Sequence, residues 1–197
     1  PVFFNVYSSR IFEPDKIAIL RSLALVMLGA WIVKLMVEGK PRPQEQVAGE
    51  SWFRTFLRTP LLPQAALLAA IYIISTIFSV TPRASLWGSY QRLQGTYTTL
   101  SYLIVFGVLI ATLRRREQID RLITTLILSS LPVVFYGFLQ RYELDPIAWG
   151  GDTTTRIAAN LGNSIFVAAY LIMVWPLTVM RAVDAFRSIL KSEQRLL

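Results

Sequence analysis

The sequence contains no cysteine and no histidine. These absences exclude disulfide bonds, zinc sites built from Cys and His, haem ligation through histidine and a histidine general base within this chain. Charge is also scarce, because only 16% of the 197 residues are charged, against about a quarter in an average soluble domain. Hydrophobic residues make up 54% of the chain. This balance indicates a protein that is solvated by lipid.

The scarce charges are mostly basic and give a net charge of +8. An excess of this size also occurs in proteins that bind nucleic acid. Here, however, the basic residues lie between apolar segments and not within solvated polar sequence. A membrane protein that faces an anionic cytoplasmic leaflet shows the same excess. We therefore expect membrane lipids as surroundings and no nucleic-acid partner.

Five apolar segments have about the length of roughly 20 residues that a helix needs to cross ~30 Å of hydrocarbon. They are residues 17–37, 61–80, 97–113, 122–140 and 164–180. The last four contain no charged residue, and the first carries Arg21 and Lys34 near its ends. We expect both side chains to reach the interface by snorkelling. The predicted fold is an all-α polytopic transmembrane helix bundle with about five spans, forming a single integral membrane domain over residues 1–197.

The basic residues between the segments predict an orientation. The regions after the first, third and fifth segments hold four Lys or Arg each, whereas those after the second and fourth hold two each. Because cytoplasmic loops are enriched in Lys and Arg, the C-terminus is predicted inside and the N-terminus outside. The chain begins at Pro1 without a signal-peptide pattern. We therefore expect a longer protein with an odd number of preceding transmembrane helices.

Reporter fusions test this orientation. We expect a fusion at residue 118 to report a cytoplasmic position and one at residue 150 an external position, because the arginine-rich turn lies before the first site. An external signal at residue 118 contradicts the predicted topology.

The predicted outer loop after the second segment contains Arg83, Tyr90 and Arg92. Leu86, Tyr90 and Leu93 recur at helical spacing. Gly88 and Gly95 allow a sharp turn or a close approach of backbone to a ligand. An arginine pair beside aromatic rings is suited to clamping a phosphate while a ring faces a sugar. The alternative is an ordinary interfacial aromatic belt with incidental arginines.

The predicted outer loop after the fourth segment contains Arg141 and Arg156 and leads to Asn163, which opens the fifth segment with Ser164. Asn163 or Ser164 is suited to cap that helix. A helix N-terminus that faces outward presents N–H groups to an anion. The alternative is a capped helix after a polar loop. Asp145, Asp152 and Glu143 have no spacing specific to a metal site or a general base, so no metal or cofactor is predicted.

Two segments resemble the bacterial O-antigen ligase and polymerase family of polytopic membrane proteins: LWGSYQRLQGTYTTLSYLIVF and RIAANLGNSIFVAAYLIMVWPLTVM. The second shows Arg156, then Gly162-Asn163, small residues and an aliphatic helix with a proline near its end. The resemblance implies a multi-pass protein of the bacterial cytoplasmic membrane. Such proteins transfer a glycan from an undecaprenyl-diphosphate carrier at the outer face, in general without a metal.

The resemblance also implies roles for residues. Arginines on the outer face hold the diphosphate leaving group in this family, and the positions that match are Arg83, Arg92 and Arg156, with Arg141 a weaker candidate. Tyr90 and Asn163 complete the expected substrate-binding set. No catalytic residue is assigned.

Two departures bear on activity. Family members have about twice as many spans, and the ligases carry a histidine in a large external loop, which this chain lacks. The chain resembles the N-terminal half of such a protein and is expected to be inactive as a fragment. The alternative function is a non-catalytic transmembrane subunit that packs against other transmembrane subunits.

Overall fold

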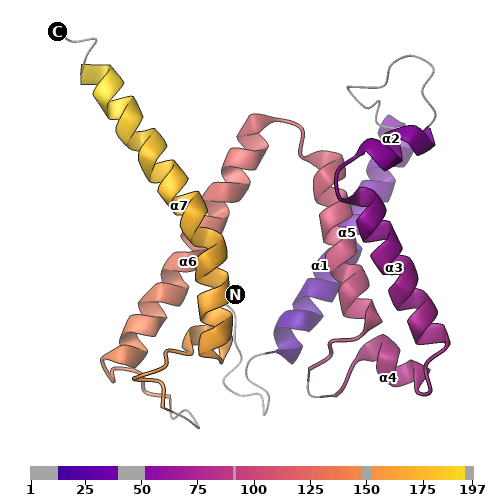
Figure 1. Cartoon of the computed structure of the whole chain (residues 1–197), viewed down its shortest axis with the longest axis horizontal. Coiled ribbons are helices and arrows are strands. Elements are labelled where there is room, and N and C mark those ends of the chain that lie inside the picture. The colour runs from indigo at the N-terminus through magenta and orange to yellow at the C-terminus, as the bar shows by residue number, and fades with distance from the viewer. Residues whose placement is uncertain (1–12, 40–51, 91, 148–151, 194–197) are drawn as a thin grey trace. The chain divides into compact units, whose positions relative to one another are not determined.

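A computed structural model describes residues 13–39, 52–90, 92–147 and 152–193. Over these residues the chain is helical and contains no strand, which confirms the all-α prediction (Figure 1). The helices are α1 (Pro14–Glu38), α2 (Trp52–Arg58), α3 (Leu62–Ile77), α4 (Pro82–Trp87), α5 (Thr96–Thr112), α6 (Arg116–Arg141), the 3-10 turn η1 (Ala159–Leu161) and α7 (Ser164–Glu193).

Each of the five predicted apolar segments lies largely or wholly in its own helix. Among the described residues, three helical segments are long and apolar enough to cross a membrane: Pro14–Glu38, Arg116–Arg141 and Ser164–Leu190. The other two, α3 and α5, have 16 and 17 residues. At ~1.5 Å per residue they measure about 24 and about 26 Å, less than the ~30 Å of a typical hydrocarbon core. The helices are those of a membrane protein.

Helix α3 ends at Ile77 and not at Val80, where the apolar segment ends. The cause is local, because the Ser79 hydroxyl accepts a hydrogen bond from the Thr81 N–H at 3.2 Å and pairs with the Ser85 hydroxyl at 2.6 Å. Side-chain bonds of this kind compete with the helical pattern. Pro82 then opens α4 and disfavours a helical conformation at Thr81.

Residues 13–114 form one compact unit. In this unit, α1 and α3 both pack on α5. The short helix α4 lies against the N-terminal end of α5 (Figure 1). The buried residues of α1 are Ile17, Arg21 and Ala24, which recur on one helical face. Ala24 and the α5 residue Ser101 are fully buried, and such small residues let helix backbones approach closely.

The described residues from 115 to 193 belong to a second compact unit, in which α6 and α7 run in opposite directions (Figure 1). Val133 of α6, Ala159 of η1 and Val167 of α7 form its buried core. The Ser129 and Tyr170 hydroxyls join the helices at 2.7 Å. The prediction of a single membrane domain stays a prediction, and the two units are described separately below.

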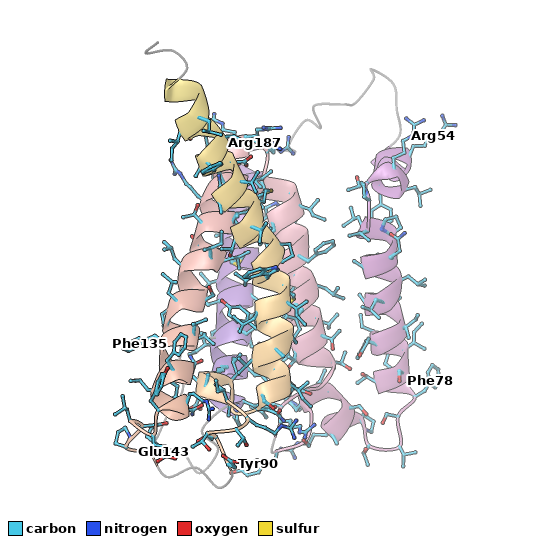
Figure 2. The ribbon with its side chains drawn as sticks, turned by 60° about the vertical axis from the view of Figure 1, so that its left-hand side comes forward. Arg54, Phe78, Tyr90, Phe135, Glu143 and Arg187 are labelled. Carbon is cyan, nitrogen blue, oxygen red and sulfur yellow. The ribbon has the colours of Figure 1, made fainter. Side chains whose placement is uncertain are left out.

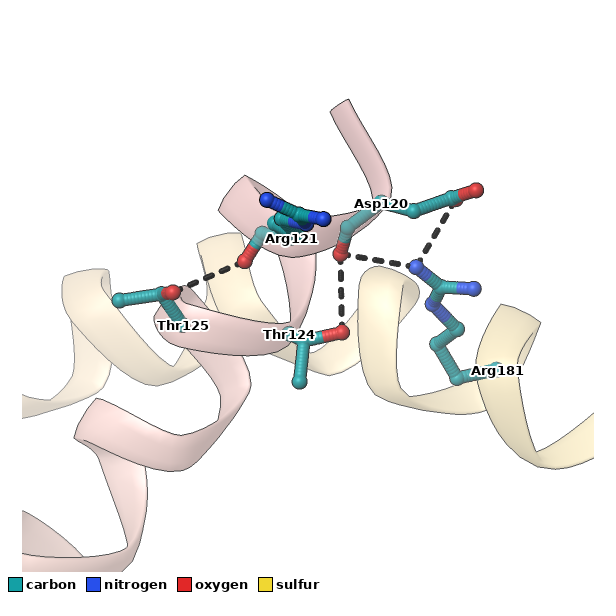
Figure 3. Close-up of polar contacts among 5 residues, drawn as sticks. All are labelled: Asp120, Arg121, Thr124, Thr125 and Arg181. Atoms are coloured by element: carbon teal, nitrogen blue, oxygen red, sulfur yellow. Dashed lines mark hydrogen bonds and ion pairs between the residues drawn. The ribbon is translucent and has the colours of Figure 1, made fainter. Parts of the chain in front are cut away.

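An ion pair closes the far end of this helix pair. Arg181 Nη2 lies 2.9 Å from both the carboxylate Oδ1 and the backbone oxygen of Asp120 (Figure 3). Both side chains remain partly exposed, at 35% and 55%, and exposed pairs stabilise by only ~0–1 kcal/mol. The pair therefore contributes little to the stability of the unit.

Large apolar side chains cover the surface of both units. Phe78, the residue after α3, and Phe135 of α6 project outward and are 82% and 65% exposed (Figure 2). Exposed apolar surface on this scale is not tolerated by a monomeric protein in water. Lipid is the solvent that suits it, in agreement with the membrane prediction.

Candidate functional site

The segment 79–96 presents three of the predicted site residues. Arg83 lies on α4 and is exposed, as is Arg92. Tyr90 is 79% exposed (Figure 2). The helical spacing of Leu86, Tyr90 and Leu93 does not correspond to one helix, because α4 ends at Trp87 and Gly88 adopts a left-handed φ of 84°. The segment turns back at this glycine.

Gly88 and Gly95 close this turn by contact with each other. A Cβ on Gly95 would lie 2.3 Å from Gly88 N and 2.4 Å from Leu86 O, and a Cβ on Gly88 would lie 2.4 Å from Gln94 N. Only glycine fits such an approach. The Ser89 carbonyl accepts the Leu93 N–H at 2.8 Å. We call residues 88–90 and 92–95 the Gly88–Gly95 loop, and Tyr90 and Arg92 lie between its two glycines.

Arg21 of α1 holds this loop, and the sequence prediction for it was wrong. Its side chain does not snorkel but is only 7% exposed. Nη2 donates to the carbonyls of Trp87 at 2.9 Å and Leu93 at 2.6 Å, and Nη2 and Nε donate to Thr98 Oγ1 at 2.8 and 3.0 Å. The guanidinium also lies 4.6 Å from the Tyr97 ring centroid and 5.8 Å from that of Trp87. The sequence signal that could have indicated this role is the position of a charged residue, Arg21, within a predicted transmembrane segment.

In the other unit, the described residues of segment 141–163 (141–147 and 152–163) are held by a different buried group. Gln140, at 1% exposure, accepts the N–H groups of Ala158 and Ala159 through Oε1 at 3.2 and 2.7 Å. Tyr136 donates to Asp145 Oδ2 at 2.8 Å. These contacts tie the segment to the last turn of α6. Sequence reasoning did not single out Gln140, although a polar residue at the end of an apolar segment marks it.

The two predicted arginines of this segment are exposed. Arg141 Nη1 donates to the Thr154 carbonyl at 2.9 Å, so that one N–H donor of its guanidinium is used within the protein. Asn163 is the N-cap of α7, as predicted, because its Oδ1 accepts the Ile165 N–H at 2.9 Å. This bond occupies the side-chain oxygen, while the side chain as a whole stays exposed.

Asp152 organises a turn. Its carboxylate accepts hydrogen bonds from the hydroxyl and N–H groups of Thr155 and Thr154. These bonds, with the Thr155 hydroxyl first among them, hold the pKa of the Asp152 carboxyl well below its usual range. A carboxylate stabilised in this way is a poor general base.

The two segments differ in charge. Segment 79–96 contains two arginines and no Asp or Glu, whereas segment 141–163 contains two arginines, two aspartates and one glutamate. Arg83, Tyr90 and Arg92 therefore form the more strongly anion-attracting set, with the buried charge of Arg21 in the same unit. Arg141, Arg156 and Asn163 form the second set, in the other unit.

No protein-family model matches the chain, and comparisons with curated proteins and with solved structures gave no match.

Proposed function

We propose that the chain is part of a membrane glycosyltransferase of the O-antigen ligase or polymerase type. In this proposal it binds an undecaprenyl-diphosphate-linked glycan at the outer face of the bacterial cytoplasmic membrane, with the N-terminus of the chain outside and the C-terminus inside. The observation that carries the proposal is the Gly88–Gly95 loop. It presents an exposed arginine and an exposed tyrosine without a carboxylate in its segment.

The chemistry follows from those side chains. Arg92 and Arg83 offer planar guanidinium groups that pair with phosphate oxygens by charge-assisted hydrogen bonds. Tyr90 offers a ring face for a sugar. When the glycan leaves its carrier, negative charge develops on the lipid diphosphate, and fixed guanidinium groups stabilise that charge. Arg156 is the corresponding candidate of the other unit, and Arg141 and Asn163 are secondary to it.

Arginine substitutions test the proposal. We expect Arg92→Ala and Arg156→Ala each to raise the Kd for undecaprenyl diphosphate about tenfold in detergent micelles, because each removes a charge-assisted bond. Binding of neutral undecaprenol should stay unchanged. Glycan transfer by the intact protein in cells should be lost, while membrane insertion is retained.

The matched control is Arg187→Ala on α7, an exposed arginine that the proposal places on the cytoplasmic side (Figure 2). Its Kd should equal that of the unmodified protein. Unchanged binding and transfer in both Arg92→Ala and Arg156→Ala would reject both candidate sets of residues.

That result would favour a second candidate, a non-catalytic subunit that packs against other transmembrane subunits. One observation supports it. A groove of about 320 Å³ between α3 and α5 is lined by large apolar residues, such as Leu103, and by the small residues Ala65, Ala69 and Gly107. Small residues at such a surface allow a neighbouring helix to approach closely in a membrane.

A further inference from the structure

We propose that Arg21 is a positioning residue, which fixes the Gly88–Gly95 loop in the geometry in which Arg92 and Tyr90 bind a lipid diphosphate. Arg21 lies on α1, 77 residues before Thr98, and its hydrogen bonds go to Trp87, Leu93 and Thr98 and not to the predicted ligand-binding side chains. This inference rests on the proposed function for the identity of the ligand. Its structural part, the control of the loop by Arg21, is independent of that function.

The hydrogen bonds of Arg21 join the two ends of the loop. The Trp87 carbonyl precedes Gly88, and the Leu93 carbonyl and the Thr98 hydroxyl lie on the returning side. Thr98 Oγ1 also donates to the Leu93 carbonyl at 2.6 Å, which completes a closed network. One planar side chain thereby holds both sides of the turn that carries Tyr90 and Arg92.

Stability alone is a poor explanation for a charged residue in this place. Burial of a guanidinium carries a large desolvation cost, and an apolar side chain of similar size often stabilises a buried site as well or better. Among the described residues no carboxylate pairs with Arg21, and its partners are carbonyl, hydroxyl and aromatic groups. What arginine adds is a rigid fork that reaches several acceptors at once. That property determines loop geometry.

The same argument predicts that lysine cannot substitute. Its ammonium keeps the charge but is a single point that lacks the planar fork and the stacking surface for Tyr97. If Arg21 acted only through its positive charge, Arg21→Lys would preserve ligand binding. If it acts through geometry, Arg21→Lys loses binding along with Arg21→Met.

Affinity measurements on the intact protein in detergent micelles test the proposal, with undecaprenyl diphosphate as probe and undecaprenol as neutral control. We expect Arg21→Lys and Arg21→Met to raise the Kd for the diphosphate about tenfold, as the loss of the Arg92 contact would, with an unchanged amount bound at saturation. A merely structural role would lower the amount bound and leave Kd unchanged. Lys34→Met, on the exposed opposite end of α1, is the control and should bind normally.

A double-mutant cycle tests whether Arg21 affects ligand binding through Arg92. In the Arg21→Lys background, Arg92→Ala should raise Kd less than about twofold, because the two residues act together. Thr98→Val removes a partner of Arg21 without removing the charge and should weaken binding in the same direction. Additive effects of Arg21→Lys and Arg92→Ala, or normal binding by Arg21→Lys, would overturn the proposal.

The absence of cysteine allows a separate measurement of the loop. A nitroxide label on Ser89→Cys, an exposed position, should become more mobile in Arg21→Lys and Thr98→Val but not in Lys34→Met. If Arg92→Ala and Arg156→Ala both bind the diphosphate normally, the proposed function fails, and the mobility of the label still shows whether Arg21 positions the loop. An unchanged spectrum in the Arg21 and Thr98 variants would show that Arg21 does not position the loop.

Discussion

Gly95→Ala is expected to lower the free energy of unfolding by about 3 kcal/mol, the upper range for an overpacked site. The added methyl would lie 2.3 Å from Gly88 N and 2.4 Å from Leu86 O, and both neighbours are backbone atoms. A backbone contact cannot be relieved by a rotamer change, so the loop itself must open. Unfolding of the purified protein in detergent, followed by circular dichroism, measures the loss.

Gly29→Ala is the matched control, because a Cβ at Gly29 meets nothing within 4 Å. Gly29 lies inside α1, where alanine is favoured over glycine by up to ~1 kcal/mol. We expect this variant to be neutral or slightly stabilised. Equal stability of Gly95→Ala and Gly29→Ala would contradict the close approach of Gly88 and Gly95.

Gln140→Leu is expected to cost about 3 kcal/mol, because each buried N–H that loses its acceptor costs roughly 1–3 kcal/mol. The substitution preserves approximate volume but removes the oxygen that accepts the Ala158 and Ala159 N–H groups. The loss should be accompanied by faster tryptic cleavage after Arg156, since that bond lies in the segment that Gln140 holds. Thermal unfolding and a timed digest measure the two effects.

Gln64→Leu is the comparison, since Gln64 is exposed in the first turn of α3. It should change neither unfolding nor the rate of cleavage after Arg156. A similar loss in both variants would show that the effect of Gln140→Leu arises from general changes in polarity.

The helices were predictable because their cause is local. An uncharged apolar segment of about 20 residues in lipid must satisfy its own backbone, which only a helix or a closed barrel does. The helix of the fifth segment shows local causes at both ends. Asn163, one of the two predicted caps, caps α7 at its start, and the helix continues through the charged tail to Glu193. The early end of α3 depended instead on hydroxyl contacts of Ser79.

The exposed site residues were partly predictable for the same reason. Arg83, Tyr90, Arg92, Arg141, Arg156 and Asn163 are all exposed in the structure. Arg83 lies in the short helix α4 and Arg141 is the last residue of α6, whereas the other four lie between helices. Their role in binding a diphosphate stays a prediction.

The sequence by itself determined the class of fold, an all-helical membrane protein, since hydropathy and helix caps act over neighbouring residues. It also determined which arginines lie between the apolar helices. Only the tertiary structure decided what Arg21, Gly88, Gly95 and Gln140 do. Arg21 was expected at the interface, whereas its guanidinium bonds to groups 66 to 77 residues away. The glycines were expected at a ligand or a turn, and the structure shows a turn that they close by contact with each other. The physical reason is that hydrogen bonds and close approaches depend on which distant segments pack together. Composition and spacing along the chain do not show which segments these are.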